Sequence, residues 1–390
     1  MKLKKFFAGV LAAAMMLTVG ATAAFADEGD NAAQAPTPIG HSQALEADSE
    51  IPLYKTYNVV NGVSPAETFT FQVEYVKTIR KDDAAGDPVG IPGNKILNLT
   101  GKQTQFGSMT AGSSDSEYFT ITPTELGLGN PKGTGKYLYK ISENAGSTAA
   151  TTYAQPIYMA VTVAHKVNDA GEIQTGYNYY VTMFKDATSA ESATSTTAEN
   201  KIDNTKAFTN TYGEGNVHNV TLSKTVHGGF GDLGKTFYFT VRFNSVENVN
   251  YGVITATKSV DSIVIKKGTE VVQTTKPNGS VYNLDYDTDY TIEMKHGENV
   301  VFGNLPAGIT YTMTENNKTG DKVDDIYNVE NEVTNKAMEN ADATVAIINT
   351  NPESPDMGVV LDNAPYIAML AIVAIGGVAL MLNKRRRDEE

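Results

Sequence analysis

Through most of the chain, apolar and polar residues alternate with the period of two that is typical of β-strands, but a few strands carry a polar residue on the apolar face. In VTLSKTV, Lys224 shares a face with Leu222 and Val226. The same alternation places Glu315 inward in GITYTMTE and Asn349 inward in TVAIINT. A lone buried ammonium group is strongly disfavoured unless it finds a partner or loses its proton. We therefore expect these three side chains to meet inside one domain.

The same order of polar residues occurs earlier in the chain, which indicates an internal repeat. In IPLYKTYNVV, Lys55 shares a face with Leu53 and Tyr57. GKYLYKISE places Glu143 inward, and KAFTNTY places Asn210 inward. Each lysine is followed by a strand with two phenylalanines, in TFTFQVEY and in TFYFTVRF. Both copies thus give lysine, glutamate and asparagine in that order.

The two copies differ in one spacing. Glu143 and Asn210 are 67 residues apart, whereas Glu315 and Asn349 are 34 residues apart. We interpret the difference as an insertion around residues 168–200 of the first copy. Its segment SATSTTAEN has the composition of a mobile loop.

The fold class predicted from these patterns is all-β, with two tandem β-sandwich domains. The expected domains cover residues 51–213 and 217–351, and the short segment GEGNVHN joins them. Two sandwiches in series on so short a tether should form an elongated rod with limited bending.

The N-terminus has the pattern of an export signal, and the C-terminus has the pattern of a membrane anchor. The first 26 residues combine lysines, an apolar stretch and the ending Ala24-Phe25-Ala26, which predicts a secretory signal peptide cleaved after Ala26. An uncharged span begins at Ala364 and precedes the basic cluster Lys384 to Arg387, which predicts a membrane helix with a cytoplasmic tail. The remaining segments are a flexible leader (27–50), a linker (352–363), the membrane helix (364–383) and the tail (384–390).

Composition excludes several classes of partner and activity. The net charge of −14 argues against nucleic acid as a partner. The chain has no cysteine, so a covalent cross-link in this exported protein cannot be a disulfide. Its five histidines are dispersed, and no hydrolase or phosphate-binding motif is present. We expect no metal, no cofactor and no turnover enzyme.

An amine, a carboxyl and a carboxamide enclosed together can react. Burial favours the neutral amine and the neutral acid, so a proton can pass from lysine to glutamate. The neutral amine can then attack the asparagine amide while the protonated carboxyl donates a hydrogen bond to its carbonyl oxygen. Ammonia leaves and a Lys–Asn amide remains. The alternatives are an inward lysine that discourages edge-to-edge aggregation, or a buried ion pair beside a hydrogen-bonded asparagine.

These motifs resemble the sortase-assembled backbone pilins of Gram-positive bacteria, especially the streptococcal major pilins with two isopeptide-linked, immunoglobulin-like (CnaB-like) domains. The resemblance rests on YKTY, LYKISE and FTNTY in the first copy and on LSKTV, YTMTE and IINT in the second. It implies isopeptide bonds from Lys55 to Asn210 and from Lys224 to Asn349. Glu143 and Glu315 would assist as the catalytic residues.

The resemblance also implies a sorting signal of the LPxTG type before the membrane helix. The matching segment is SPDMG, which comprises Ser354, Pro355, Asp356, Met357 and Gly358. Serine stands where the family has leucine, and methionine where it has threonine. Cleavage by a divergent sortase and simple membrane retention both remain open.

The implied function is a structural pilin subunit of the Gram-positive cell surface. Its partners would be sortase, other pilin subunits in a covalent homopolymer, and cell-wall peptidoglycan. Lys201 and Lys206 are candidates for the lysine that joins subunits, although each also reads as an ordinary surface lysine. The alternative function is a surface adhesin stalk that does not polymerise.

Overall fold

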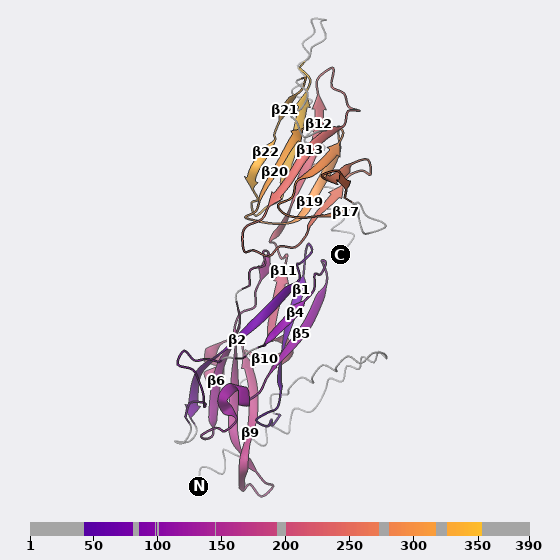
Figure 1. Ribbon diagram of the computed structural model, residues 1–390. Coiled ribbons are helices and arrows are strands. Elements are labelled where there is room, and N and C mark those ends of the chain that lie inside the picture. The colour runs from indigo at the N-terminus through magenta and orange to yellow at the C-terminus, as the bar shows by residue number, and fades with distance from the viewer. Residues whose placement is uncertain are drawn as a thin grey trace, which may run out of the picture.

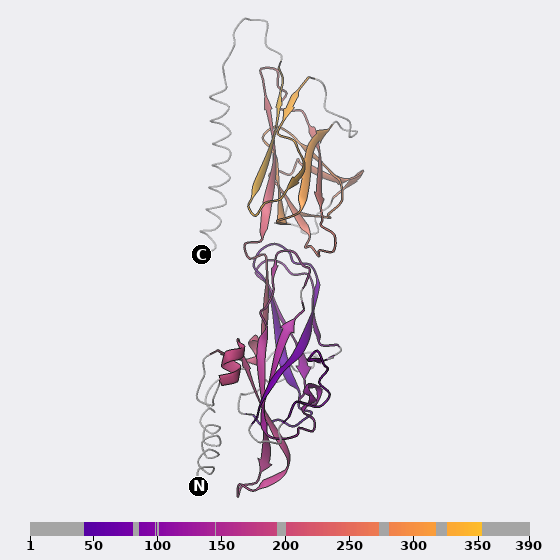
Figure 2. The same cartoon turned by 90° about the vertical axis from the view of Figure 1, so that its left-hand side faces the viewer.

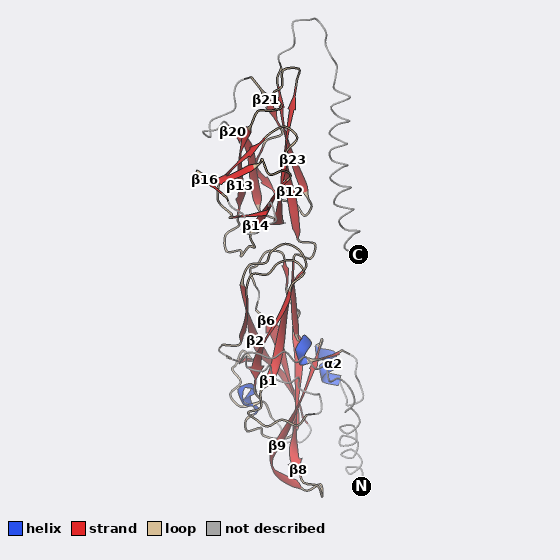
Figure 3. Ribbon diagram, turned by 90° about the vertical axis from the view of Figure 1, so that its right-hand side faces the viewer, coloured by secondary structure: helices blue, strands red, loops and turns tan. Residues whose placement is uncertain are grey.

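The structure is a computed structural model that describes residues 43–80, 86–97, 99, 101–144, 146–192, 200–272, 281–316 and 326–352. Within these residues nearly all regular structure is β-strand, and the short helical segments lie in the N-terminal half (Figure 3). The predicted all-β fold class is thereby confirmed.

Two sheets form the N-terminal half. In spatial order, the four-stranded sheet contains β5 (Ser114–Ile121), β1 (Ile51–Val59), β11 (Phe208–Tyr212) and β7 (Thr151–Thr152). The seven-stranded sheet contains β10 (Lys201–Ile202), β9 (Ile173–Phe184), β8 (Ile157–Val167), β6 (Gly135–Glu143), β2 (Glu67–Arg80) and β3 (Ile96–Leu97), and β4 (Gln103–Phe106) also pairs with β2. The helical segments are η1 (Thr124–Leu128), α2 (Ala187–Ser192) and η2 (Asn204–Lys206).

Two six-stranded sheets form the C-terminal half. The first contains β17 (Val281–Leu284), β14 (Ile254–Lys258), β19 (Asn299–Pro306), β12 (Val217–His227), β23 (Ala343–Thr350) and β21 (Asn328–Glu330). The second contains β16 (Glu270–Val271), β15 (Val264–Lys267), β18 (Tyr290–Met294), β13 (Phe237–Asn244), β20 (Thr310–Asn316) and β22 (Val333–Ala337).

Each half encloses its own apolar core. In the N-terminal half, Leu53 from one sheet and Phe69 from the other belong to a single buried cluster. In the C-terminal half, Leu222 and Phe239 do the same. Because the inward faces of both sheets contribute to one core, each half is a β-sandwich.

The first and last strands of each sandwich lie side by side and run parallel. In the N-terminal half, β1 pairs with β11. In the C-terminal half, β12 pairs with β23. The two ends of each half therefore share one sheet although most of the half separates them in sequence, and this pairing positions the candidate site.

Part of the predicted insertion is regular structure. Within residues 168–200, β9 adds a long strand to the seven-stranded sheet and α2 packs beside it. Loop composition obscured this strand because its first half is exposed and polar, with inward residues only from Tyr179 onward. The expected mobile loop covers residues 192–200; Ser192 is the last residue of α2, and residues 193–199 lie outside the described residues.

The described end of the predicted flexible leader is also ordered. Leu45 forms a β-bridge with Tyr179, and its side chain is buried. The backbone carbonyl of Ala47 accepts a hydrogen bond from the N–H of Thr124. A single buried leucine with backbone pairing therefore holds residues 45–47 against the sandwich, despite the polar composition around them.

The two sandwiches are joined end to end (Figures 1 and 2). Asn304 of the C-terminal half lies at the centre of the joint, where only 5% of its surface is exposed. Its Nδ2 donates to the carbonyl oxygens of Val63 (2.7 Å) and Val253 (2.8 Å), and its Oδ1 accepts from the hydroxyl of Tyr212 (2.8 Å). One side chain thus ties both halves together with no unsatisfied polar atom.

The backbones on either side of the joint also approach closely. Asn250 donates its N–H to the carbonyl of Ser147 and accepts the N–H of Ala149. A Cβ on Gly62 would lie 2.0 Å from Asn304 Oδ1, and a Cβ on Gly252 would lie 2.0 Å from the Val63 carbonyl. The two halves are therefore held together by a close-packed interface as well as by the short segment that connects them.

We predict that Asn304→Gly loosens the joint without unfolding either sandwich. Asn304 has a φ of 62°, a backbone conformation that glycine adopts freely, so the change removes the side chain alone. Small-angle X-ray scattering should show a broader range of inter-sandwich orientations. The matched control is Asn335→Gly, at a φ of 48° in β22. Scattering identical to the wild type in Asn304→Gly would contradict this role.

Candidate functional site

Strand pairing brings the predicted lysine and asparagine of the N-terminal half together. Lys55 on β1 pairs with Phe208 of β11, and Asn210 lies two residues further along β11. Residues two apart in a strand point to the same side, so both side chains enter the core. Glu143 ends β6 in the facing sheet, where it pairs with Phe71 of β2.

Glu143 bridges the other two side chains. Lys55 Nζ lies 2.6 Å from Glu143 Oε2, and Asn210 Nδ2 donates to Glu143 Oε1 at 2.6 Å. Lys55 and Asn210 are fully buried. The side chain of Glu143 is 2% exposed. One carboxylate oxygen therefore holds the amine, and the other holds the amide nitrogen.

The asparagine carbonyl has a different partner from the one expected. The sequence-based expectation was a hydrogen bond from the glutamate to this oxygen. Instead, the backbone N–H of Ala154 donates to Asn210 Oδ1 at 2.7 Å. The Asn210 amide thus presents its oxygen to the backbone and its nitrogen to Glu143.

The C-terminal half repeats the arrangement. Lys224 on β12 pairs with Ile347 of β23, and Asn349 lies two residues further along β23. Lys224 Nζ lies 2.6 Å from Glu315 Oε2, and Asn349 Nδ2 donates to Glu315 Oε1 at 2.6 Å. Lys224, Glu315 and Asn349 are all buried. Both sequence-predicted sets therefore converge with the same geometry.

Aromatic rings lie beneath both amines. Lys55 Nζ is 4.5 Å from the ring centroid of Phe69, and Lys224 Nζ is 4.2 Å from that of Phe237. An ammonium group over a ring face is stabilised by the ring quadrupole. These phenylalanines marked the repeat in the sequence, but their role beneath the amines required the structure.

Burial makes both amines less basic. Desolvation lowers the pKa of Lys55 to about 8, against the opposing effect of the neighbouring Glu143 carboxylate. Desolvation likewise lowers the pKa of Lys224 to about 8, against the hydrogen bond and charge of Glu315. Both amines are thus closer to the neutral, nucleophilic form than a surface lysine.

The second site differs from the first around the carbonyl. Among the described residues, no group hydrogen-bonds to Asn349 Oδ1, although this atom is buried. The second site has its own additional contact, in which the backbone N–H of Glu315 donates to Glu332 Oε1 at 2.6 Å. Neither Ala154 nor Glu332 was predicted, because no side-chain pattern marks a backbone donor, and Glu332 lies in the short connection between β21 and β22.

The remaining predicted site residues lie outside the described residues. These are the sorting-signal residues Pro355, Asp356, Met357 and Gly358, and the signal peptide and the membrane helix lie outside as well. In the described part of the chain no helix has the length and apolar character needed to cross a bilayer. The same part contains no cluster of three or more potential metal ligands.

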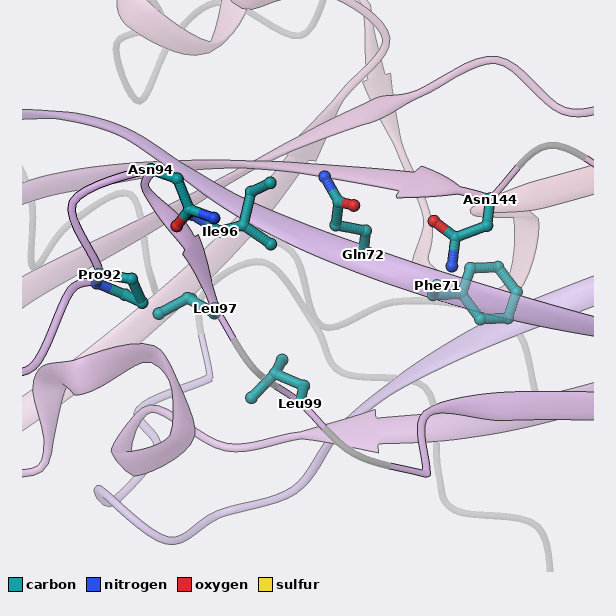
Figure 4. Close-up of a pocket in the computed structure, with 8 residues that line it drawn as sticks. All are labelled: Phe71, Gln72, Pro92, Asn94, Ile96, Leu97, Leu99 and Asn144. Carbon is teal, nitrogen blue, oxygen red and sulfur yellow. Dashed lines mark hydrogen bonds between the residues drawn. The ribbon is translucent and has the colours of Figure 1, made fainter.

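One depression lies beside the first site. It borders β2 and β3, and its polar lining comes from Gln72, Asn94 and Asn144 (Figure 4). None of its lining residues is charged. The depression itself offers no acid, base or nucleophile.

We predict a pH-dependent stability when the triad cannot react. In an Asn210→Ala chain, Lys55 keeps a free amine that is neutral above about pH 8 when folded, yet protonated up to about pH 10 when unfolded. The unfolded state then binds more protons, so the free energy of unfolding should rise from pH 8 to pH 10 by up to about 3 kcal/mol.

Urea titrations of the N-terminal transition at several pH values would measure this rise. The control adds Lys55→Met to the same Asn210→Ala chain, which removes the titrating amine and should abolish the rise. Equal pH profiles for the two chains would show that Lys55 has an ordinary pKa.

Comparison with known proteins gives three kinds of match. A family model described as a domain of unknown function (DUF7601) matches residues 218–351. A protein named pilin from Streptococcus pyogenes serotype M1 is 25% identical over 367 residues, which cover 88% of this chain and 93% of that protein.

Solved structures also align with the chain. The major pilin of Streptococcus pyogenes is 19% identical, with a TM-score of 0.48, over 77% of this chain and 98% of that one. The T-13 major pilin of the same species is 15% identical, with a TM-score of 0.44, over 77% and 97% of the two chains. The sequence match over most of both chains confirms that this protein resembles pilins of the streptococcal type.

Proposed function

We propose that the chain is a pilus subunit of a Gram-positive cell surface, locked by two internal amide bonds. The bonds join Lys55 to Asn210 and Lys224 to Asn349, with Glu143 and Glu315 as proton carriers. The observation that supports this proposal is the twofold occurrence of one buried arrangement, in which a carboxylate holds an amine and an amide nitrogen at 2.6 Å each. Chance burial of three polar groups would have no reason to recur with the same strand offsets.

Each bond can form without any external reagent. Lys55 Nζ passes a proton to Glu143 Oε2 and attacks Cγ of Asn210. The Glu143 carboxyl then delivers this proton to Nδ2 as the Cγ–Nδ2 bond breaks, ammonia leaves, and the regenerated carboxylate takes up a second proton from Nζ. The atoms balance, because an amine and a primary amide become one secondary amide and one ammonia. The folded core holds the reactants in contact, which supplies a large effective molarity.

The product stays in the chain, so each site reacts once. The protein would therefore act as a structural subunit and not as an enzyme on a separate substrate. In a chain-entropy estimate, a cross-link that closes a loop of more than about 100 residues stabilises the fold by about 5 kcal/mol.

Mechanical strength is the second benefit. The bonded residues lie on the parallel first and last strands of each sandwich. Tension that enters through the first strand and leaves through the last would cross from lysine to asparagine directly. The strands between them would carry little load, so a pulled subunit would keep its fold.

The wider proposal follows the family resemblance. It assigns two immunoglobulin-like (CnaB-like) domains to residues 51–213 and 217–351, with export by the signal peptide. Sortase would act at SPDMG, and the product would join other pilin subunits and peptidoglycan. Between the two candidate linking lysines, Lys206 is exposed and Lys201 is half-buried on β10, so Lys206 is the more accessible nucleophile.

Intact mass spectrometry of purified residues 27–352 tests the cross-links. The wild type should be lighter than its sequence by two ammonia molecules, because each bond releases one. Glu143→Ala should restore the mass of one ammonia molecule, and the double variant with Glu315→Ala should restore the mass of both. Glu293→Ala is the matched control, since Glu293 pairs with Lys266 without an asparagine and should leave the deficit intact. A wild type of full mass would refute the bonds.

Immunoblots of cell-wall extracts from the native host test the assembly. A polymerising subunit should give a ladder of high-mass species that resist boiling in detergent, because covalent bonds join the copies. Deletion of residues 354–358 should collapse the ladder to one band, since sortase would have no site. A single band in the wild type would favour the non-polymerising adhesin stalk.

A further inference from the structure

The loop that follows β7 aims a backbone N–H at the first reactive amide. β7 pairs with the end of β11, with Thr152 opposite Thr211. Two residues beyond β7, the N–H of Ala154 donates to Asn210 Oδ1 at 2.7 Å. This loop therefore touches the oxygen whose charge must change if the amide is attacked.

A fixed tyrosine holds this loop in place. The hydroxyl of Tyr153 donates to Glu67 Oε1 at 2.9 Å and accepts the N–H of Thr148 at 2.9 Å. Its ring forms a T-shaped contact with that of Phe69, with 6.3 Å between ring centroids. Phe69 is also the ring beneath Lys55 Nζ. Tyr153 thus sets the position of Ala154 relative to the same aromatic residue that supports the nucleophile.

Attack on an amide moves negative charge onto its oxygen. A donor already aimed at that oxygen stabilises the transition state, and loss of one such donor typically slows acyl transfer by about 100-fold to 1,000-fold. Glu143 cannot serve as this donor in the observed geometry, because its two oxygens hold Lys55 Nζ and Asn210 Nδ2. The Ala154 N–H is the group that remains to receive the developing charge.

The second site provides an internal contrast. Asn349 Oδ1 is buried, and no described residue offers it a donor. The carboxylate bridge and the aromatic ring beneath the amine are otherwise the same in both sites. The two sites therefore differ in whether the amide oxygen has a fixed donor, and in the Glu332 carboxylate that accepts the Glu315 N–H at the second site.

We propose that the backbone N–H of Ala154 is a catalytic oxyanion donor of the first site, positioned by Tyr153 and Glu67. The first bond then forms faster than the second. This inference rests on the proposed cross-linking function, and it adds a rate difference that the function alone does not require.

Timed cell-free synthesis measures both rates in one chain. Aliquots quenched in acid are digested, and the branched and linear peptides of each site are quantified by mass spectrometry. In the wild type, the Lys55–Asn210 bond should form at least about tenfold faster than the Lys224–Asn349 bond. In every variant, the rate at which the second bond forms serves as the internal reference for the rate of the first.

The decisive variant replaces the Ala154 amide with an ester. Incorporation of lactic acid at this position by nonsense suppression exchanges N–H for oxygen and keeps the methyl group. The first bond should slow by about 100-fold, while the second keeps its rate. The matched control places the same lactic acid at Ala170, whose N–H donates to Asn168 Oδ1 in an exposed turn, and this chain should react within about twofold of the wild type.

A second variant covers the case in which the ester chain does not fold. Tyr153→Phe removes the anchoring hydroxyl, and the first bond should slow by about tenfold. Amide exchange of β1 and β11 in an Asn210→Ala background should stay unchanged, which separates positioning from loss of structure.

Three results would overturn the inference: a second bond that forms as fast as the first, an ester chain that keeps the wild-type rate, or a Tyr153→Phe chain that does so. Failure of the proposed function looks different, because then neither branched peptide forms in any chain, including the wild type.

Discussion

An amine enclosed between two apolar sheets is the constraint on which each half of this protein depends. Lys55 and Lys224 are buried as deeply as the core residues around them, and burial lowers the pKa of each to about 8. A charge in such a place needs a partner, and a carboxylate from the facing sheet supplies it at 2.6 Å. That carboxylate also holds an asparagine, so the need to satisfy one buried charge gathers three reactive groups.

The sheet topology means that each group of three side chains connects the first and last strands of its sandwich. Because the first and last strands are parallel neighbours, the lysine and the asparagine mark the two ends of each sandwich. Asn304 connects the two halves in a similar way. Its buried side chain hydrogen-bonds to both halves and leaves none of its polar atoms unpaired. A bond across each strand pair and a fitted joint between the pairs would together give a continuous load-bearing path.

Strand alternation was enough to predict most of the site, because a period of two determines which residues face inward. It placed Lys55, Glu143 and Asn210 in the core, and the repeat placed their counterparts. It could not predict Ala154 or Asn304, since a backbone donor has no side-chain signature and a polar residue near a strand end looks like ordinary surface. The strand β9 was not recognised in the sequence for a related reason: its first half is exposed and mostly polar, and so resembles a loop.

Tandem mass spectrometry of the proteolytic peptides of the mature protein tests most directly whether the two internal amide bonds exist. Two branched peptides are expected, one that joins Lys55 to Asn210 and one that joins Lys224 to Asn349, each lighter than its two parent peptides by one ammonia. Recovery of linear peptides that carry unmodified Lys55, Asn210, Lys224 and Asn349 in full yield would contradict the existence of these bonds.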